Sequence, residues 1–128
     1  MALLHHPRFV VAMRVLFWLA LAFAVVMAVL PKPPELPIDR LGDKFAHILA
    51  FGTLAGLAAF GFPSELRWRV AERLSFLGAL IEMVQGIPAL HRDSDIRDWI
   101  ADTLAILAVM AIAAMLVPRV KQDIAPAA

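Results

Sequence analysis

The sequence contains no cysteine. This absence excludes disulfide bonds and metal sites built on thiolates. An excess of charge of either sign is also lacking, because 12 Lys and Arg residues stand against 11 Asp and Glu residues, for a formal net charge of +1. The sequence also has no basic patch interleaved with aromatic residues, the usual sequence mark of nucleic-acid binding. A nucleic-acid partner is therefore not expected.

Apolar residues, in contrast, are abundant. They make up 62% of the 128 residues, with a mean hydropathy of +0.78, whereas roughly 45–50% is usual in soluble domains. A chain of this length folds as one small domain, and a small domain leaves much of its surface exposed. A soluble core could not hide this much apolar surface, so the composition predicts a polytopic membrane protein.

Four apolar runs predict four transmembrane helices, at about residues 9–30, 45–62, 70–87 and 99–117. About 20 apolar residues span a bilayer. The third run is interrupted by two polar residues, so it is expected to span only where neighbouring helices cover its polar side. The predicted fold is an all-α integral membrane bundle of four transmembrane helices, formed by residues 1–128 as a single domain. Prolines mark the edges of the runs: Pro7, Pro31, Pro63, Pro88 and Pro118.

The first run has a rival interpretation as a signal peptide. It is longer than the apolar core of a usual signal peptide, and no small-x-small cleavage site closes it before Pro31, so an uncleaved transmembrane helix is favoured. Four spans place both termini on one side. The termini and the 63–73 connector carry seven of the 12 Lys and Arg residues, against five in the other two loops. This bias favours cytoplasmic termini, with the loops at 31–44 and 88–98 facing outward.

The acidic residues concentrate in residues 82–102, which hold five of the 11 acids between two apolar runs. Charges beside a bilayer are costly unless they are paired, hydrated or functional. Asp98 and Asp102 are four residues apart and therefore share one face of the fourth helix. His47 lies one turn beyond Asp43 on the second helix in the same way.

Glu82 and Gln85 share a face of the third helix, and Glu82 lies the deeper of the two. We therefore expect His47, Glu82 and Asp102 to lie at a similar depth and to converge inside the bundle. The alternative is that these residues have no functional role and are polar only because water reaches the ends of short helices. The polar residues expected nearer the surface, among them the counter-ions Arg92 and Arg97, are Asp43, Lys44, Arg92, Arg97 and Asp98.

A metal site and a catalytic nucleophile are both weakly indicated. One histidine with carboxylates can bind a divalent cation, but the sequence has no H-x-x-x-H or H-E-x-x-H spacing. No metal and no cofactor are therefore expected. Ser94 lies in the acidic region, but no G-x-S-x-G elbow surrounds it.

Three segments together resemble the VanZ-like family of small multi-pass bacterial membrane proteins. They are DKFAHILAFGTLAGL from Asp43, the EMVQ stretch of the third helix, and the spaced residues from Arg92 to Asp102. The resemblance covers residues 43 to about 115, and Asp102 stands where the family usually has asparagine. It implies a small multi-pass membrane protein, for which we expect a location in the cytoplasmic membrane, and the name-giving member is linked to low-level resistance to the glycopeptide teicoplanin. The motif positions that it carries over are Asp43, Lys44, His47, Glu82, Gln85, Arg92 and Asp98.

Three functions are compatible with these residues. The first is non-catalytic binding of a lipid or envelope-precursor headgroup, or of a glycopeptide, with basic side chains on phosphate or carboxylate. The second is a membrane-embedded enzyme that acts on such a headgroup. In it His47 is the general acid or base, Glu82 or Asp102 orients it, and Arg92 stabilises charge. The third is a structural bundle whose polar cluster only holds loops together. The oligomeric state and the identity of the ligand stay open.

Overall fold

The computed structural model describes residues 6–116, apart from the side chain of Asp39. This part of the chain contains four α-helices and no strand, which confirms the all-α prediction. The helices begin two or three residues and end one or two residues earlier than the apolar runs. Of the three connectors between them, the first contains the 3-10 turn η2 (Pro37–Leu41) and the third contains η3 (Pro88–Leu90). The four helices are α1 (Pro7–Val29), α2 (Asp43–Gly61), α3 (Arg67–Gln85) and α4 (Ile96–Leu116).

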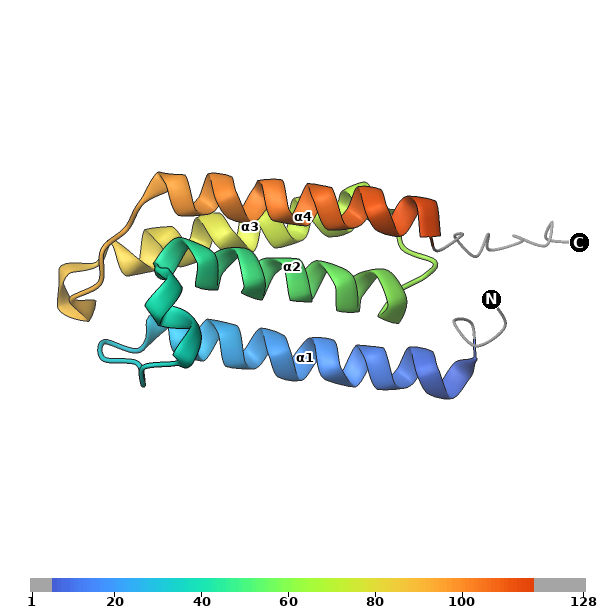
Figure 1. Ribbon diagram of the computed structural model, residues 1–128, viewed down its shortest axis with the longest axis horizontal. Coiled ribbons are helices and arrows are strands. Elements are labelled where there is room, and N and C mark those ends of the chain that lie inside the picture. Colours follow the sequence, from blue (N-terminus) through green and yellow to red (C-terminus); the bar gives the residue numbers. More distant parts are fainter. Residues whose placement is uncertain (1–5, 117–128) are drawn as a thin grey trace, which may run out of the picture.

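The helices run alternately in opposite directions and lie side by side (Figure 1). The first helix begins at a proline, whose missing N–H costs nothing at that position, and the His6 side chain caps it by accepting a hydrogen bond from the Arg8 amide at 3.3 Å. Gly42 precedes α2 with a φ of 99°, a conformation that side chains disfavour and glycine allows. The chain therefore turns sharply between η2 and α2.

The second helix is central, because it packs mainly against α1 and α4, while α3 packs mainly against α4 (Figure 1). Small residues allow these approaches. A Cβ atom added to Gly52 or Gly56 would lie 3.9 or 4.0 Å from the Val109 side chain of α4. Leu54 of α2 and Ile106 of α4 are both buried in the core. Gly52 and Gly56 of α2 therefore face another helix of the same chain.

Most of the apolar surface outside this core stays exposed. On α1 only Phe17 is buried, while Trp18, Leu19 and Phe23 are each more than half exposed. With 23, 19 and 21 residues, α1, α2 and α4 are long and apolar enough to cross a membrane. At 1.5 Å per residue they measure roughly 28–35 Å, close to the ~30 Å hydrocarbon core of a bilayer.

Among the described residues the length and composition of a membrane span are met by three helices, not by the four that the sequence predicts. The exception is α3. Its first two turns carry Arg67, Arg69, Glu72 and Arg73, and Glu82 lies near its end. Five charges in 19 residues leave no sufficiently apolar window, so the apolar run alone overstated how membrane-like the whole helix is.

Two arginines bind helix carbonyls at the end of the bundle where α1 begins. Arg14 Nε donates to the Gly61 carbonyl of α2 at 2.6 Å, and the Arg14 guanidinium lies over the Phe62 ring. Arg67 Nη2 donates to the Ala113 carbonyl of α4 at 3.3 Å. A cation beside the last carbonyls of a helix is favourable, since these groups lack intrahelical partners. This end is held by basic groups, whereas the buried acids lie at the other end.

Candidate functional site

The connectors that follow α1 and α3 meet at one end of the bundle, where α2 and α4 begin (Figure 1). Four polar side chains of the described residues are buried, and all four belong to the parts of α3 and α4 nearest this end. A helix end offers unpaired backbone groups and access to water, which favours polar side chains there. The four buried polar residues are Glu82, Gln85, Asp98 and Asp102.

The central contact joins α2 to α4. His47 Nδ1 lies 3.1 Å from Asp102 Oδ2, and the Asp102 side chain has no solvent exposure. An ionised carboxylate accepts hydrogen bonds only, so Nδ1 donates to Asp102 and Nε2 is the ring nitrogen left for another partner. The other oxygen, Asp102 Oδ1, is buried without a hydrogen-bond partner among residues 6–116. Asp102 therefore orients the imidazole through one carboxylate oxygen, while its other oxygen has no hydrogen bond within the described residues.

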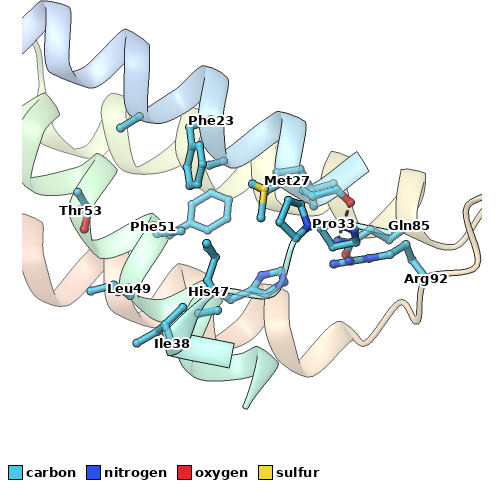
Figure 2. A pocket seen from close by; sticks show the side chains of 18 residues that line it. Phe23, Met27, Pro33, Ile38, His47, Leu49, Phe51, Thr53, Gln85 and Arg92 are labelled. Carbon is cyan, nitrogen blue, oxygen red and sulfur yellow. Dashed lines mark hydrogen bonds between the residues drawn. The ribbon is translucent and has the colours of Figure 1, made fainter. Parts of the chain in front are cut away.

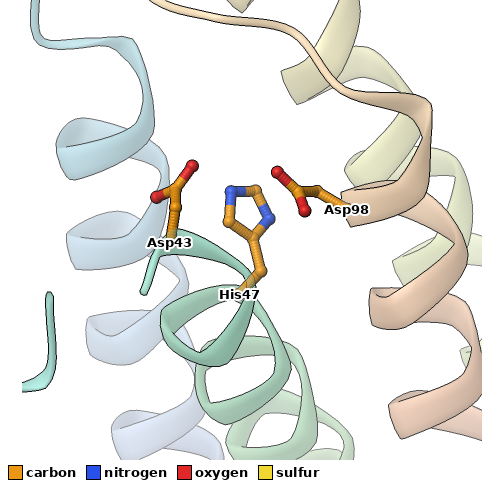
Figure 3. Close-up of side chains that lie close together, drawn as sticks. All are labelled: Asp43, His47 and Asp98. Atoms are coloured by element: carbon orange, nitrogen blue, oxygen red, sulfur yellow. The ribbon is translucent and has the colours of Figure 1, made fainter. Parts of the chain in front are cut away.

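Two further acids flank the imidazole. Figure 3 shows the His47 ring between the carboxylates of Asp43 and Asp98. Ligand-type atoms of the three side chains all lie within 4.8 Å of one another. Asp43 is exposed and Asp98 is buried. The sequence offered no two-histidine spacing, but the fold brings these three potential metal ligands together from two helices.

The counter-ion of this acidic cluster is a lysine. Lys44 Nζ lies 3.3 Å from Asp98 Oδ1, and about half of the Lys44 side chain is exposed. The expectation that Arg92 and Arg97 serve as counter-ions is not met, because neither guanidinium forms an ion pair or hydrogen bond within the described part of the chain. The lysine is nearer because it lies one turn before His47 on the same helix.

Glu82 has a different role from the one that its depth predicts. Its Oε2 accepts hydrogen bonds from the Asp95 amide at 2.9 Å and from Ser94 Oγ at 3.2 Å. Its hydrogen bonds therefore go to the loop before α4, not to His47. The other oxygen, Oε1, is buried and has no partner in residues 6–116. Of the three residues expected to converge, His47 and Asp102 are in direct contact, whereas Glu82 binds the loop before α4.

A pocket of about 340 Å³ adjoins this cluster. It opens between α1, α2, α3 and the proline-rich connector (Figure 2). Figure 2 shows Gln85 and Arg92 side by side at one end of the pocket, with apolar side chains along the rest of it. Gln85 Nε2 donates to the Ala28 carbonyl at 3.1 Å. The residues that line the pocket include Phe23, Met27, Pro33, Ile38, His47, Phe51, Gln85 and Arg92.

Sequence reasoning missed the part that the first helix and the connector play in this pocket. From the sequence, the apolar helix that contains Phe23 and Met27 is interpreted only as a membrane span, and Pro33 only as part of a connector. No local signal distinguishes these residues from lipid-facing ones. The sequence indicates Arg92 as a binding residue, but its neighbours in the pocket follow only from the tertiary structure.

A second polar contact between helices was also missed. Ser75 Oγ and Thr103 Oγ1 lie 2.7 Å apart, and Trp99 Nε1 donates to the Ser75 carbonyl at 3.0 Å. These residues join α3 to α4 through part-buried hydrogen bonds. Their signal is a single hydroxyl residue in each of two apolar runs, which is too common to be read as a contact.

Comparison with known proteins finds no match: no protein-family model, no curated protein and no solved structure is similar to this chain.

Proposed function

We propose that this chain is a four-span protein of the bacterial cytoplasmic membrane, VanZ-like in type, that binds an anionic lipid or envelope-precursor headgroup. The proposal rests mainly on the adjacency of an apolar pocket to the guanidinium of Arg92, which has no partner among the described residues. An amphiphile matches both parts. Its chain fits the apolar walls and its phosphate fits a guanidinium, which binds such oxygens in bidentate fashion.

The third helix can serve as the fourth span despite its charges. Arg69, Glu72 and Arg73 are exposed in its first turns, where a charged interface can hold them, and Glu82 is buried inside the bundle. Its outer face then carries large apolar side chains, with Phe76 64% and Met83 72% exposed. A helix whose polar groups face its neighbours satisfies the condition for spanning. The Lys and Arg distribution favours cytoplasmic termini, an orientation in which the pocket lies on the outer side.

Lipid binding by the full chain tests the proposal. Protein purified in a neutral detergent is mixed with phosphatidylglycerol, polyprenyl phosphate, phosphatidylcholine or teicoplanin, and bound ligand is counted by native mass spectrometry. We expect retention of the phosphate-bearing anionic lipids over phosphatidylcholine. Arg92→Gln is expected to weaken this retention about tenfold, the scale of one charged hydrogen bond. Preferential retention of teicoplanin would instead assign the pocket to the glycopeptide.

Two variants separate pocket binding from general charge effects. Arg97→Gln removes an exposed arginine at the same end of the bundle, whose guanidinium forms no ion pair or hydrogen bond within residues 6–116 and whose backbone amide donates to Asp95 Oδ1. It is the matched control and should retain lipid. Ala50→Leu fills the pocket without changing charge and should reduce retention. Equal binding by wild type, Arg92→Gln and Ala50→Leu would leave the purely structural bundle as the better account.

The pair of His47 and Asp102 favours an enzyme as the second candidate. A buried carboxylate that fixes the proton on Nδ1 leaves Nε2 as a base, the arrangement used in acid–base catalysis. His47 also lines the pocket, so a bound headgroup would meet this nitrogen. Incubation of the protein with the retained lipid, followed by mass analysis of the lipid, distinguishes the two. Turnover that His47→Gln abolishes while binding persists would establish the enzyme, and unchanged lipid would leave binding alone.

A further inference from the structure

We propose that Asp43, His47 and Asp98 bind a divalent transition-metal ion of the Zn²⁺ or Mn²⁺ class at the outer end of α2 and α4. Potential ligand atoms of the three side chains lie within 4.8 Å of one another (Figure 3). Ligands at ~2.0–2.2 Å from one ion stand roughly 3–4 Å apart. Small rotations of the side chains therefore bring the set to coordination distance.

The hydrogen bond between His47 and Asp102 is the independent observation that supports this site. Histidines that bind metals usually donate their other ring N–H to a carboxylate, which fixes the tautomer and raises the basicity of the coordinating nitrogen. Asp102 Oδ2 accepts the hydrogen bond of His47 Nδ1 at 3.1 Å, and the Asp102 side chain is fully buried. Nε2 is thereby left as the free donor nitrogen. Asp102 is thus a positioning residue for a ligand.

The charge balance points the same way. Three acidic side chains, from Asp43, Asp98 and Asp102, lie around the imidazole of His47, and Lys44 Nζ pairs with them at 3.3 Å from Asp98 Oδ1. With the imidazole in the neutral form that binds metals, the acids of this cluster exceed its bases by two charges; Asp98 and Asp102 are buried, and Asp102 Oδ1 has no hydrogen-bond partner in the described chain. Uncompensated buried charge is expensive. A bound divalent cation would supply the missing charge of two.

The ligand types select the class of ion. One imidazole with two carboxylates suits Zn²⁺ and Mn²⁺ better than Ca²⁺, which prefers a shell of six to eight oxygens. Three protein ligands leave at least one coordination position open. Since His47 also lines the pocket, that position lies beside the space assigned to the ligand. An ion on Nε2 excludes His47 as a general base in the same state, although metal binding itself does not depend on the lipid.

Metal binding by the full chain in detergent tests the inference. Protein stripped with EDTA and dialysed is titrated with Zn²⁺ or Mn²⁺ by calorimetry, and the bound metal is counted by elemental analysis. We expect one ion per chain. Asp98→Asn and His47→Gln each remove a ligand and should weaken binding at least tenfold. Asp102→Asn should weaken it about 10- to 100-fold without removing a ligand.

Asp93→Asn is the matched control, because Asp93 is an exposed acid in the adjoining loop and lies outside the cluster. It should bind as wild type does. For bound Mn²⁺, nitrogen couplings in pulsed electron paramagnetic resonance should appear in wild type and vanish in His47→Gln. Thermal unfolding of the stripped variants checks that each is folded, and added metal should raise the unfolding temperature of wild type but not of Asp98→Asn.

Several results would overturn the site. These are the absence of stoichiometric binding, equal affinity in Asp98→Asn and Asp93→Asn, or bound Mn²⁺ without a nitrogen coupling. Lipid retention is measured separately on the stripped protein. A failure of metal binding with lipid retention intact would refute this inference alone, whereas loss of lipid retention with metal binding intact would refute the proposed function alone.

Discussion

His47 and Asp102 come from different helices and are 55 residues apart in the sequence, yet Nδ1 of the one lies 3.1 Å from Oδ2 of the other. The contact links α2 to α4 at the most buried carboxylate of the described chain. Asp98 lies one turn before Asp102, paired with Lys44. The cluster therefore contributes to packing as well as to the proposed chemistry, and the following predictions separate the two.

A double-mutant cycle on His47→Ala and Asp102→Ala should give a coupling energy of about 0.5–3 kcal/mol, the range found for residues in one hydrogen-bonded network. The measurement is reversible unfolding in mixed detergent, with EDTA present so that metal does not contribute. Each single change leaves the other group without its partner, so both should destabilise. Strict additivity of the two changes would show that the 3.1 Å contact contributes nothing to stability.

Glu82 should control the order of the loop before α4. Glu82→Ala removes the acceptor of the Asp95 amide, so hydrogen exchange in a peptide that covers residues 92–97 should become roughly 10- to 100-fold faster, as expected for a lost hydrogen bond to a charged group. Glu82→Gln keeps an acceptor oxygen and should exchange nearly as wild type does. Glu65→Ala, at the opposite end of the bundle, should leave this peptide unchanged. Unaltered exchange in Glu82→Ala would contradict the assigned role.

The absence of cysteine allows the topology to be mapped with single introduced thiols. Ser64 and Asp93 are exposed and lie in the connectors on either side of α3. If α3 crosses the membrane, an impermeant maleimide should label Asp93→Cys in intact cells and Ser64→Cys only after permeabilisation. Labelling of both positions from the same side would show that α3 does not span and that three helices do. A reporter fused after Ala128 should be active only as a cytoplasmic reporter.

Gly78 of α3 lies beside the Asp102 side chain of α4. A methyl group at Gly78 would lie 3.4 Å from Asp102 Oδ2 and 3.4 Å from the Trp99 ring, which is ordinary contact. Gly78→Ala should therefore change stability little, whereas Gly78→Leu should cost about 1–3 kcal/mol by overpacking. Ala108→Leu, at an exposed position of α4, is the control and should be tolerated. Thermal unfolding in detergent measures all three, and a tolerated Gly78→Leu would refute the packing argument.

The composition and periodicity of the chain determine the four helices, their alternating directions and the end of the bundle at which the acids gather. Long apolar runs bounded by proline can satisfy their backbone only as helices, and short connectors make consecutive helices antiparallel. Helical spacing also placed Asp98 with Asp102 and Asp43 with His47, because the repeat of 3.6 residues is a local property. These features need no knowledge of which helix packs against which.

The tertiary structure decided the partners. Depth along the bundle is readable from sequence, but the rotation of each helix about its axis depends on the packing of all its neighbours. With the rotations found in the structure, Asp102 contacts His47 and Glu82 accepts hydrogen bonds from residues 94–95. Lys44 then pairs with Asp98. The same packing also forms the pocket beside Arg92 from residues of α1 and the connector. Apolar side chains that face lipid and those that line a pocket are alike in sequence, so only the packed bundle distinguishes them.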